Sequence, residues 1–320
     1  MLKIKISLRK LKRFYENTTH SNVVQSVRRL IFTHCSQSIE ELGWYHADMV
    51  YSKGGTGILI KYQEKFFLLT AQHVLDNNYK TAENESPFFT HLFAKRGWEG
   101  MEGMGFPMRG WRIGELITAD SPYIDMEDIV LIELSSSLVR FPDKFIDLDA
   151  VGGRVAVSVS DLYDGMFLVA SGYPTDKNPI EYHYGDDYNC STVINKHIYH
   201  GVCEFEGSAP ILRSRSHITH ADINGMSGGM VSNLMPKSNQ VAWVGMIQKA
   251  GNNIIHFYPA CWIIPAIKNY MQASYYVIDP AVCMTNIEVE STPEAIQGRR
   301  EYFKMIKVIT DKMMATEAGH

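Results

Sequence analysis

The chain has 320 residues, of which 45% are apolar and 21% charged, with a formal net charge of −4. This length allows one large or two small domains with a sizeable core, and the composition excludes a disordered or fibrous chain. The small negative charge does not favour binding of the whole molecule to a polyanion such as nucleic acid.

Residues 1–45 are expected to form a basic, largely helical extension. Val23, Val24, Val27, Leu30 and Ile31 recur at helical spacing. Within the first thirty residues the basic side chains face a single acid, Glu16; they are Lys3, Lys5, Arg9, Lys10, Lys12, Arg13, Arg28 and Arg29. Such an arm can contact nucleic acid, an anionic membrane or an acidic partner. A solvated, partly mobile terminus is the simpler alternative.

Targeting signals and cysteine usage favour a cytoplasmic protein. Charged residues throughout positions 3–13 interrupt any apolar core of a secretory signal. No stretch approaches the roughly 18 apolar residues that a membrane span needs. The five cysteines are odd in number and scattered, which does not suggest a disulfide framework; they are Cys35, Cys190, Cys203, Cys261 and Cys283. Free thiols in a reducing compartment are the simpler interpretation.

The central part of the chain has the pattern of an all-β core. Short runs of β-branched and aromatic residues alternate with glycine-rich turns, which predicts strands of a sandwich or barrel. The runs occupy 57–62, 66–71, 129–134, 155–159, 167–170, 198–205 and 241–247. Residues 77–110 are expected to be long loops with a strand or two, and residues 176–190 form a polar, tyrosine-rich insertion.

The C-terminal segment is expected to be helical again. Residues 291–294 combine a capping hydroxyl, a proline and an acid, which is a helix-start signal. The apolar residues that follow lie on one stripe; they are Ile296, Phe303, Ile306, Ile309 and Met313. This stripe either packs on the body of the protein or docks a regulatory protein partner.

Three segments carry the residue types of nucleophilic catalysis. His73 ends an apolar run, Asp128 opens another, and Ser227 lies among glycines in the run Gly225-Met226-Ser227-Gly228-Gly229. A serine hydroxyl needs a base to remove its proton, an imidazole can do so near neutral pH, and a carboxylate can hold that imidazole in place. The N–H groups of Gly225 and Ser227 would form an oxyanion hole.

These segments together resemble the trypsin/chymotrypsin-fold serine proteases, in particular the bacterial type. Residues 70–74 (Thr-Ala-Gln-His-Val) resemble the histidine motif of that family, residues 128–131 its aspartate motif and residues 225–229 its serine motif. The resemblance covers about residues 48–272. It implies an all-β core of two antiparallel β-barrels, 46–140 and 141–275, with flanking segments 1–45 and 276–320. It also implies hydrolysis of peptide bonds by His73, Asp128 and Ser227, without a cofactor.

The resemblance also places the residues that would select the substrate. Ala221 and Asp222 would line the primary specificity pocket, and Gln248, Lys249 and Ala250 would form the facing wall. Asp222 could favour a basic substrate residue, although an aspartate in a turn is commonly a local hydrogen-bonding group.

Other readings of the same residues stay open. Asp120 and Asp125 compete with Asp128, which is preferred because an apolar run follows it directly. Met226 stands where the family usually has an acidic or amide residue that holds a newly cut N-terminus, so activation by that route is not expected. A latent protease switched on by a partner is compatible with this sequence. The alternative function is a catalytically silent fold of this type that binds peptides or acts as a scaffold.

A metal site is the remaining possibility. Cys190, His197, His200 and Cys203 are residue types that bind zinc. Because residues 198–205 are expected to be a strand, His197 and His200 should lie on opposite faces. No metal is therefore predicted.

Overall fold

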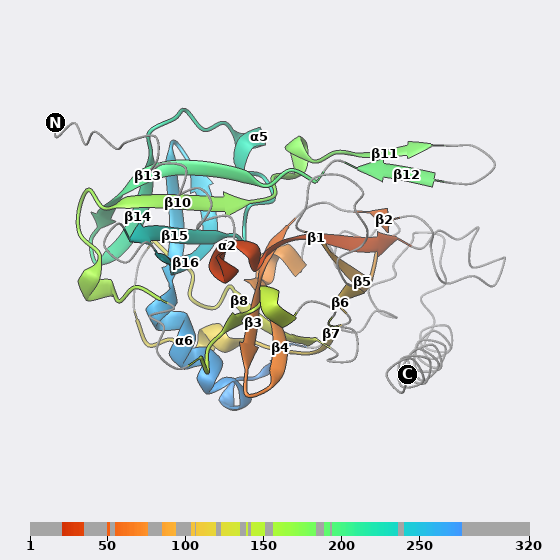
Figure 1. Cartoon of the computed structure of the whole chain (residues 1–320), viewed down its shortest axis with the longest axis horizontal. Coiled ribbons are helices and arrows are strands. Elements are labelled where there is room, and N and C mark those ends of the chain that lie inside the picture. Colours follow the sequence, from red (N-terminus) through yellow and green to blue (C-terminus); the bar gives the residue numbers. More distant parts are fainter. Residues whose placement is uncertain are drawn as a thin grey trace.

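The computed structural model describes the central part of the chain. The described residues are 21–34, 50–51, 55–75, 85–93, 104–105, 107–119, 123–134, 139, 142–150, 156–183, 189–192, 194–235 and 240–276. The basic segment 1–20 and the predicted C-terminal helix lie outside these ranges, so both stay predictions. Within them the protein is mainly β, with few and short helices (Figure 1).

One half of the β structure is a closed six-stranded antiparallel barrel. Its strands follow one another in the order β10-β13-β14-β17-β16-β15. They are β10 (Phe167–Gly172), β13 (His197–Glu206), β14 (Ala209–Ser214), β15 (Met230–Met235), β16 (Gln240–Gly251) and β17 (Ile254–Pro259). Fully buried apolar side chains such as Leu168, Leu212 and Phe257 fill it. The predicted strands at 167–170, 198–205 and 241–247 are confirmed.

The predicted strand at 155–159 is wrong. Within it, Ala156 forms a single bridge to Trp243, and Val157 donates a backbone hydrogen bond to Trp243. The chain then turns through a short 3-10 helix, η4 (Val159–Asp161), so no further residue can pair with β16.

The other half is a ten-stranded sheet in the order β18-β7-β8-β4-β3-β1-β5-β6, with β2 paired to β1 and β9 to β3. The strands are β1 (Val27–His34), β2 (Val50–Tyr51), β3 (Thr56–Tyr62), β4 (Lys65–Ala71), β5 (Glu85–Phe93), β6 (Met104–Gly105), β7 (Pro107–Trp111), β8 (Ile129–Leu134), β9 (Ile146–Asp147) and β18 (Tyr275–Tyr276). The predicted strands at 57–62, 66–71 and 129–134 are confirmed. The sequence predicts two barrels, whereas the structure has one closed barrel and this sheet.

The helical prediction for the N-terminal region is wrong at residues 27–34. Only α2 (Asn22–Gln25) is helical, and the chain then continues as β1 between β3 and β5. Val27 and Leu30 are fully buried, so tertiary pairing overrides the helical spacing of the apolar residues. Arg28 and Arg29 were counted with the basic arm, but both side chains are buried, and Arg29 donates to the backbone oxygen of Asn178.

The two halves share one apolar core. Side chains of the sheet, including Ile58 and Phe67, belong to the same buried cluster as Trp243 and Met246 of the barrel. Helix α6 (Ala260–Lys268) follows β17 and buries its apolar face in this cluster. The site described below lies where the halves meet.

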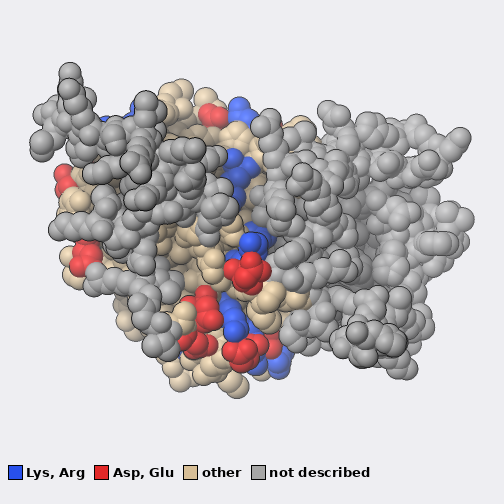
Figure 2. All heavy atoms as spheres, in the orientation of Figure 1, with Lys and Arg blue, Asp and Glu red and all other residues tan. Residues whose placement is uncertain are grey.

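The polar insertion at 176–190 contains most of a hairpin. Strands β11 (Ile180–His183) and β12 (Asn189–Thr192) pair only with each other and extend away from the barrel (Figure 1). Over the described part of the face in Figure 2, acidic and basic side chains lie next to one another. No helix among the described residues is long and apolar enough to cross a membrane.

Candidate active site

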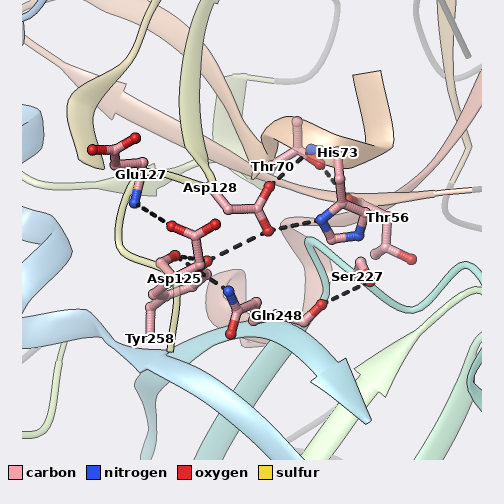
Figure 3. Close-up of polar contacts among 9 residues, drawn as sticks. All are labelled: Thr56, Thr70, His73, Asp125, Glu127, Asp128, Ser227, Gln248 and Tyr258. Atoms are coloured by element: carbon pink, nitrogen blue, oxygen red, sulfur yellow. Dashed lines mark hydrogen bonds and ion pairs between the residues drawn. The ribbon is translucent and has the colours of Figure 1, made fainter. Parts of the chain in front are cut away.

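Pairing of two neighbouring strands brings His73 and Asp128 together. His73 lies in a short helical turn at the end of β4, and Asp128 immediately precedes β8. These strands are antiparallel, with Ala71 opposite Ile129, so the end of one meets the start of the other. The His73 Nδ1–Asp128 Oδ2 distance is 2.7 Å, and the His73 backbone N–H donates to Asp128 Oδ1 at 2.8 Å. The carboxylate therefore fixes both the ring and the backbone of His73 (Figure 3).

A buried tyrosine from the barrel reaches the same carboxylate. The Tyr258 hydroxyl donates to the backbone oxygen of Asp125 at 2.5 Å and lies 3.5 Å from Asp128 Oδ2. The pKa of Tyr258 is raised well above its ordinary value. The main cause is burial, and the negative charges of Asp128 and Asp125 add to it. The hydroxyl thus stays protonated and remains a donor.

Asp125, the alternative partner considered for His73, instead holds the loop before β8 in place. Its side chain accepts the Glu127 backbone N–H, and its backbone oxygen accepts from both Tyr258 and the Gln248 amide. The structure therefore pairs His73 with Asp128 and uses Asp125 to shape the loop before β8.

Ser227 sits in a tight loop between α5 (His220–Ile223) and β15. Gly225 and Gly228 have φ values of +88° and +81°, which disfavour other residues. A Cβ on Gly228 would lie 1.9 Å from the backbone oxygen of Thr56. The loop thus requires glycine both for its backbone angles and for its contact with the start of β3.

Thr56, the first residue of β3, connects this loop to the ten-stranded sheet. Its N–H donates to the backbone oxygen of Ser227 at 3.1 Å, and its hydroxyl donates to the backbone oxygen of Gly225 at 2.9 Å. The same hydroxyl accepts the Tyr173 N–H. Because Thr56 is fully buried, these bonds hold the serine loop against the strand that leads, through β4, to His73.

The Ser227 hydroxyl is bonded to the barrel rather than to the histidine. Ser227 Oγ donates to the backbone oxygen of Gln248 at 2.8 Å. No hydrogen bond joins Ser227 Oγ to His73 in this structure, although Figure 3 shows Ser227 on the opposite side of the imidazole from Asp128.

Two backbone N–H groups of the serine loop are left open. The backbone oxygen of Asn224 accepts the Thr175 N–H at 2.7 Å. In a trans peptide the N–H points opposite to the C=O, so the Gly225 N–H is directed away from Thr175. Within the described part of the chain, neither the Gly225 nor the Ser227 N–H donates a hydrogen bond. Both remain available to an oxygen atom of a ligand.

A cavity of about 270 Å³ lies beside these groups. Besides His73, Asp128, Gly225 and Ser227, its lining residues are His220, Ile223, Asn224, Gln248, Lys249 and Ala250. It is slightly smaller than the ~300–1,000 Å³ of a typical small-molecule pocket. The site can therefore hold a side chain or another small group next to the serine.

The facing wall predicted from the sequence lines this cavity, but Ala221 and Asp222 do not. The Asp222 carboxylate turns back to cap its own helix, where it accepts from Thr219 N at 2.9 Å and Thr219 Oγ1 at 2.6 Å. These bonds first, and then Lys177, lower the pKa of Asp222 to about 2. The carboxylate of Asp222 is therefore engaged by Thr219 and Lys177.

His220, Ile223 and Asn224 also line the cavity and were not predicted from the sequence. Positions three apart on a helical turn lie on one side, and α5 turns this side towards the cavity and Asp222 away from it. The capping pattern Thr219–Asp222 was the available signal, because a capping residue points back to the helix start.

Of the residues weighed as a metal site, Cys203 and His200 lie apart. In β13 the Cys203 side chain is buried inside the barrel, whereas His200 is exposed and stacks on Phe167. No group of three metal-binding side chains occurs among the described residues. Burial raises the pKa of the Cys203 thiol to about 11, so the thiol stays protonated at neutral pH.

In chemical terms, the site joins a carboxylate-bound imidazole, a serine hydroxyl and two open backbone N–H groups around one cavity. Comparison of the chain with known protein families and with curated proteins finds no match.

Proposed function

We propose that this protein is a serine endopeptidase of the trypsin/chymotrypsin type, with Ser227 as nucleophile, His73 as general base and Asp128 as the residue that orients His73. The observation that carries the proposal is the 2.7 Å His73–Asp128 pair in the same cavity as Ser227. The closed barrel and the ten-stranded sheet would correspond to the two barrels of that family.

Hydrolysis would proceed by acyl transfer. Ser227 Oγ attacks the carbonyl carbon of a peptide bond while His73 Nε2 takes its proton, and the imidazolium then protonates the leaving amine. Water, activated by His73, releases the acyl group from Ser227. Asp128 stabilises the imidazolium and keeps Nδ1 protonated. These groups need no cofactor.

The open N–H groups of Gly225 and Ser227 would bind the oxyanion of the tetrahedral intermediate. Such donors each contribute about 2.7–4 kcal/mol of barrier lowering. The Thr175–Asn224 hydrogen bond supports this role, since it keeps the Asn224 carbonyl away from the site.

The contact between Ser227 and Gln248 supports a latent resting state. A hydroxyl that donates to a carbonyl must first turn to His73 before it can be activated. A partner that binds the terminal segments could control this step. We also propose a cytoplasmic location, since Cys203 is a free, buried thiol.

The same contact favours the alternative function, a catalytically silent fold that binds peptides or acts as a scaffold. In that case Ser227 would keep its bond to Gln248 when a peptide occupies the cavity. The two functions differ in whether Ser227 becomes nucleophilic.

Labelling with a fluorophosphonate probe tests the proposal. The wild-type protein should react at Ser227, as located by peptide mass spectrometry, and Ser227→Ala should not. His73→Ala should also lose labelling, because the base is absent. Turnover of a cleaved peptide should fall on the order of 10⁶-fold in Ser227→Ala. A folded wild-type protein that stays unlabelled at Ser227, while it binds peptides, would support the scaffold function instead.

A further inference from the structure

One lysine, Lys249, lines the cavity next to Ser227. Apart from His73 and Asp128, the titratable lining residues are His220 and Lys249. Both oxygens of Asp128 are already engaged by His73. The cavity therefore presents the ammonium group of Lys249, with no unengaged carboxylate among its lining residues.

Lys249 differs from most described lysines in having no partner. Lys61, Lys65, Lys144 and Lys177 each pair with an acidic side chain, and Lys196 donates to a backbone oxygen. Lys249 makes no ion pair or hydrogen bond with any described residue. An unpaired ammonium group at the wall of a cavity is a ready partner for an anionic ligand.

A histidine, His256, lies beside Lys249 on the same sheet face but does not line the cavity. Lys249 of β16 is directly opposite His256 of β17, and opposite residues of paired strands point to the same face. The buried Nδ1 of His256 has no hydrogen-bond partner. Burial first, and also the charge of Lys249, lowers the pKa of His256, while Glu206 acts in the opposite direction and does not line the cavity.

We infer that the cavity beside Ser227 receives an acidic side chain, Asp or Glu, of a peptide or protein ligand, with Lys249 and His220 as the residues that select it. If the proposed function holds, on which this assignment of a substrate class rests, cleavage follows the acidic residue. Half-buried Ile223 and Ala250 would contact the methylene part of the side chain, and Lys249 and His220 would donate to its carboxylate. This replaces the preference for a basic substrate residue that Asp222 suggested in the sequence. The Asp222 carboxylate is held by Thr219 and Lys177 and does not line the cavity.

Binding to the Ser227→Ala variant tests the inference without requiring turnover. Fluorescent peptides that differ at one position (Glu, Gln, Lys or Leu) are titrated and followed by anisotropy. The Glu peptide should bind at least about tenfold more tightly than the Lys peptide, as expected for opposite instead of like charge at close range. Lys249→Glu, made in the Ser227→Ala background, should reverse this order, and Lys249→Gln should abolish the preference of Glu over Gln.

Lys268→Glu is the matched control. Lys268 is also exposed and unpaired among the described residues, but it lies on α6 and does not line the cavity. The same change in net charge there should leave the order of the peptides as it is. Equal or tighter binding of the Lys peptide, or no measurable binding of the Glu peptide at ~1 mM, would overturn the inference. Fluorophosphonate labelling of wild-type protein reports separately on the proposed function.

Discussion

At the scale of single residues, Thr56 has a larger role than its place in the sequence suggests. Its side chain is fully buried between the two halves, and its hydroxyl accepts one hydrogen bond, from Tyr173, and donates one to the Gly225 carbonyl. From the sequence alone, the glycines beside Ser227 are the visible feature of the serine loop. The residue that holds this loop to the sheet lies 169 positions away from Gly225, and only folding brings it there.

Replacement of this hydroxyl should weaken both the fold and the serine loop. Thr56→Val leaves the Tyr173 N–H without an acceptor and should cost about 1–3 kcal/mol of unfolding free energy. It should also slow fluorophosphonate labelling, because the Gly225 peptide loses an anchor. Urea denaturation and labelling rates check this. Thr56→Ser keeps the hydroxyl and is the control; an equal loss in both variants would show that the methyl group matters instead.

At the scale of elements, the central strands of the sheet are joined by one buried carboxylate. Glu133 of β8 has a side chain that is only 10% exposed. It accepts from Arg109 of β7 at 2.8 and 3.0 Å and pairs with Lys65 of β4 at 3.3 Å. These pairs link the two strands that flank β8, the strand that Asp128 precedes.

Neutralising this carboxylate should destabilise the sheet. Glu133→Gln removes charge-assisted bonds to Arg109 and Lys65 and should lower the unfolding free energy by about 1–3 kcal/mol, with both partners half-exposed and screened. The Lys61–Glu64 pair offers a comparison, since Glu64 is 87% exposed, and Glu64→Gln should change stability much less than Glu133→Gln. Similar losses in the two variants, measured by urea denaturation, would contradict a special role for Glu133.

Elements also show where prediction from sequence worked and where it did not. The runs at 57–62, 66–71 and 129–134 were predicted as strands because β-branched and apolar residues are continuous there, as in strands buried on both faces. The run at 27–34 was predicted as helix because its apolar residues also fit a 3.6-residue period. The run forms a strand because it pairs with β3 and β5. Both partners lie elsewhere in the chain, so the residues of the run do not by themselves predict this pairing.

At the scale of the whole molecule, stability should depend on pH through half-buried histidines. Burial is the largest cause that lowers the pKa of both His197 and His256. Each imidazole therefore binds a proton more weakly in the folded than in the unfolded state. Below the unfolded pKa of about 6.5, the unfolded state takes up more protons, so stability falls as pH decreases and is fully present above 6.5.

Urea denaturation between pH 5 and 8 checks this dependence. The unfolding free energy should rise with pH up to about 6.5 and then level off as far as these groups are concerned. His256→Gln should make the rise shallower, because one of the two groups no longer titrates. A stability that falls between pH 5 and 6.5 would contradict the assignment.

The amino-acid sequence by itself predicted which residues would do chemistry. Histidine, aspartate and serine each lie at the end of an apolar run or in a glycine-rich loop, and such local patterns can be read directly. The strands at 57–62, 66–71 and 129–134 were predictable for the same reason, and the wall at Gln248, Lys249 and Ala250 followed from the resemblance to a known family. Only the tertiary structure decided that His220 and Ile223 line the cavity, that Asp222 turns away from it and that the Ser227 hydroxyl rests on Gln248. The physical reason is that the direction of a side chain depends on helix capping, strand pairing and contacts across the two halves, which join residues far apart in the chain.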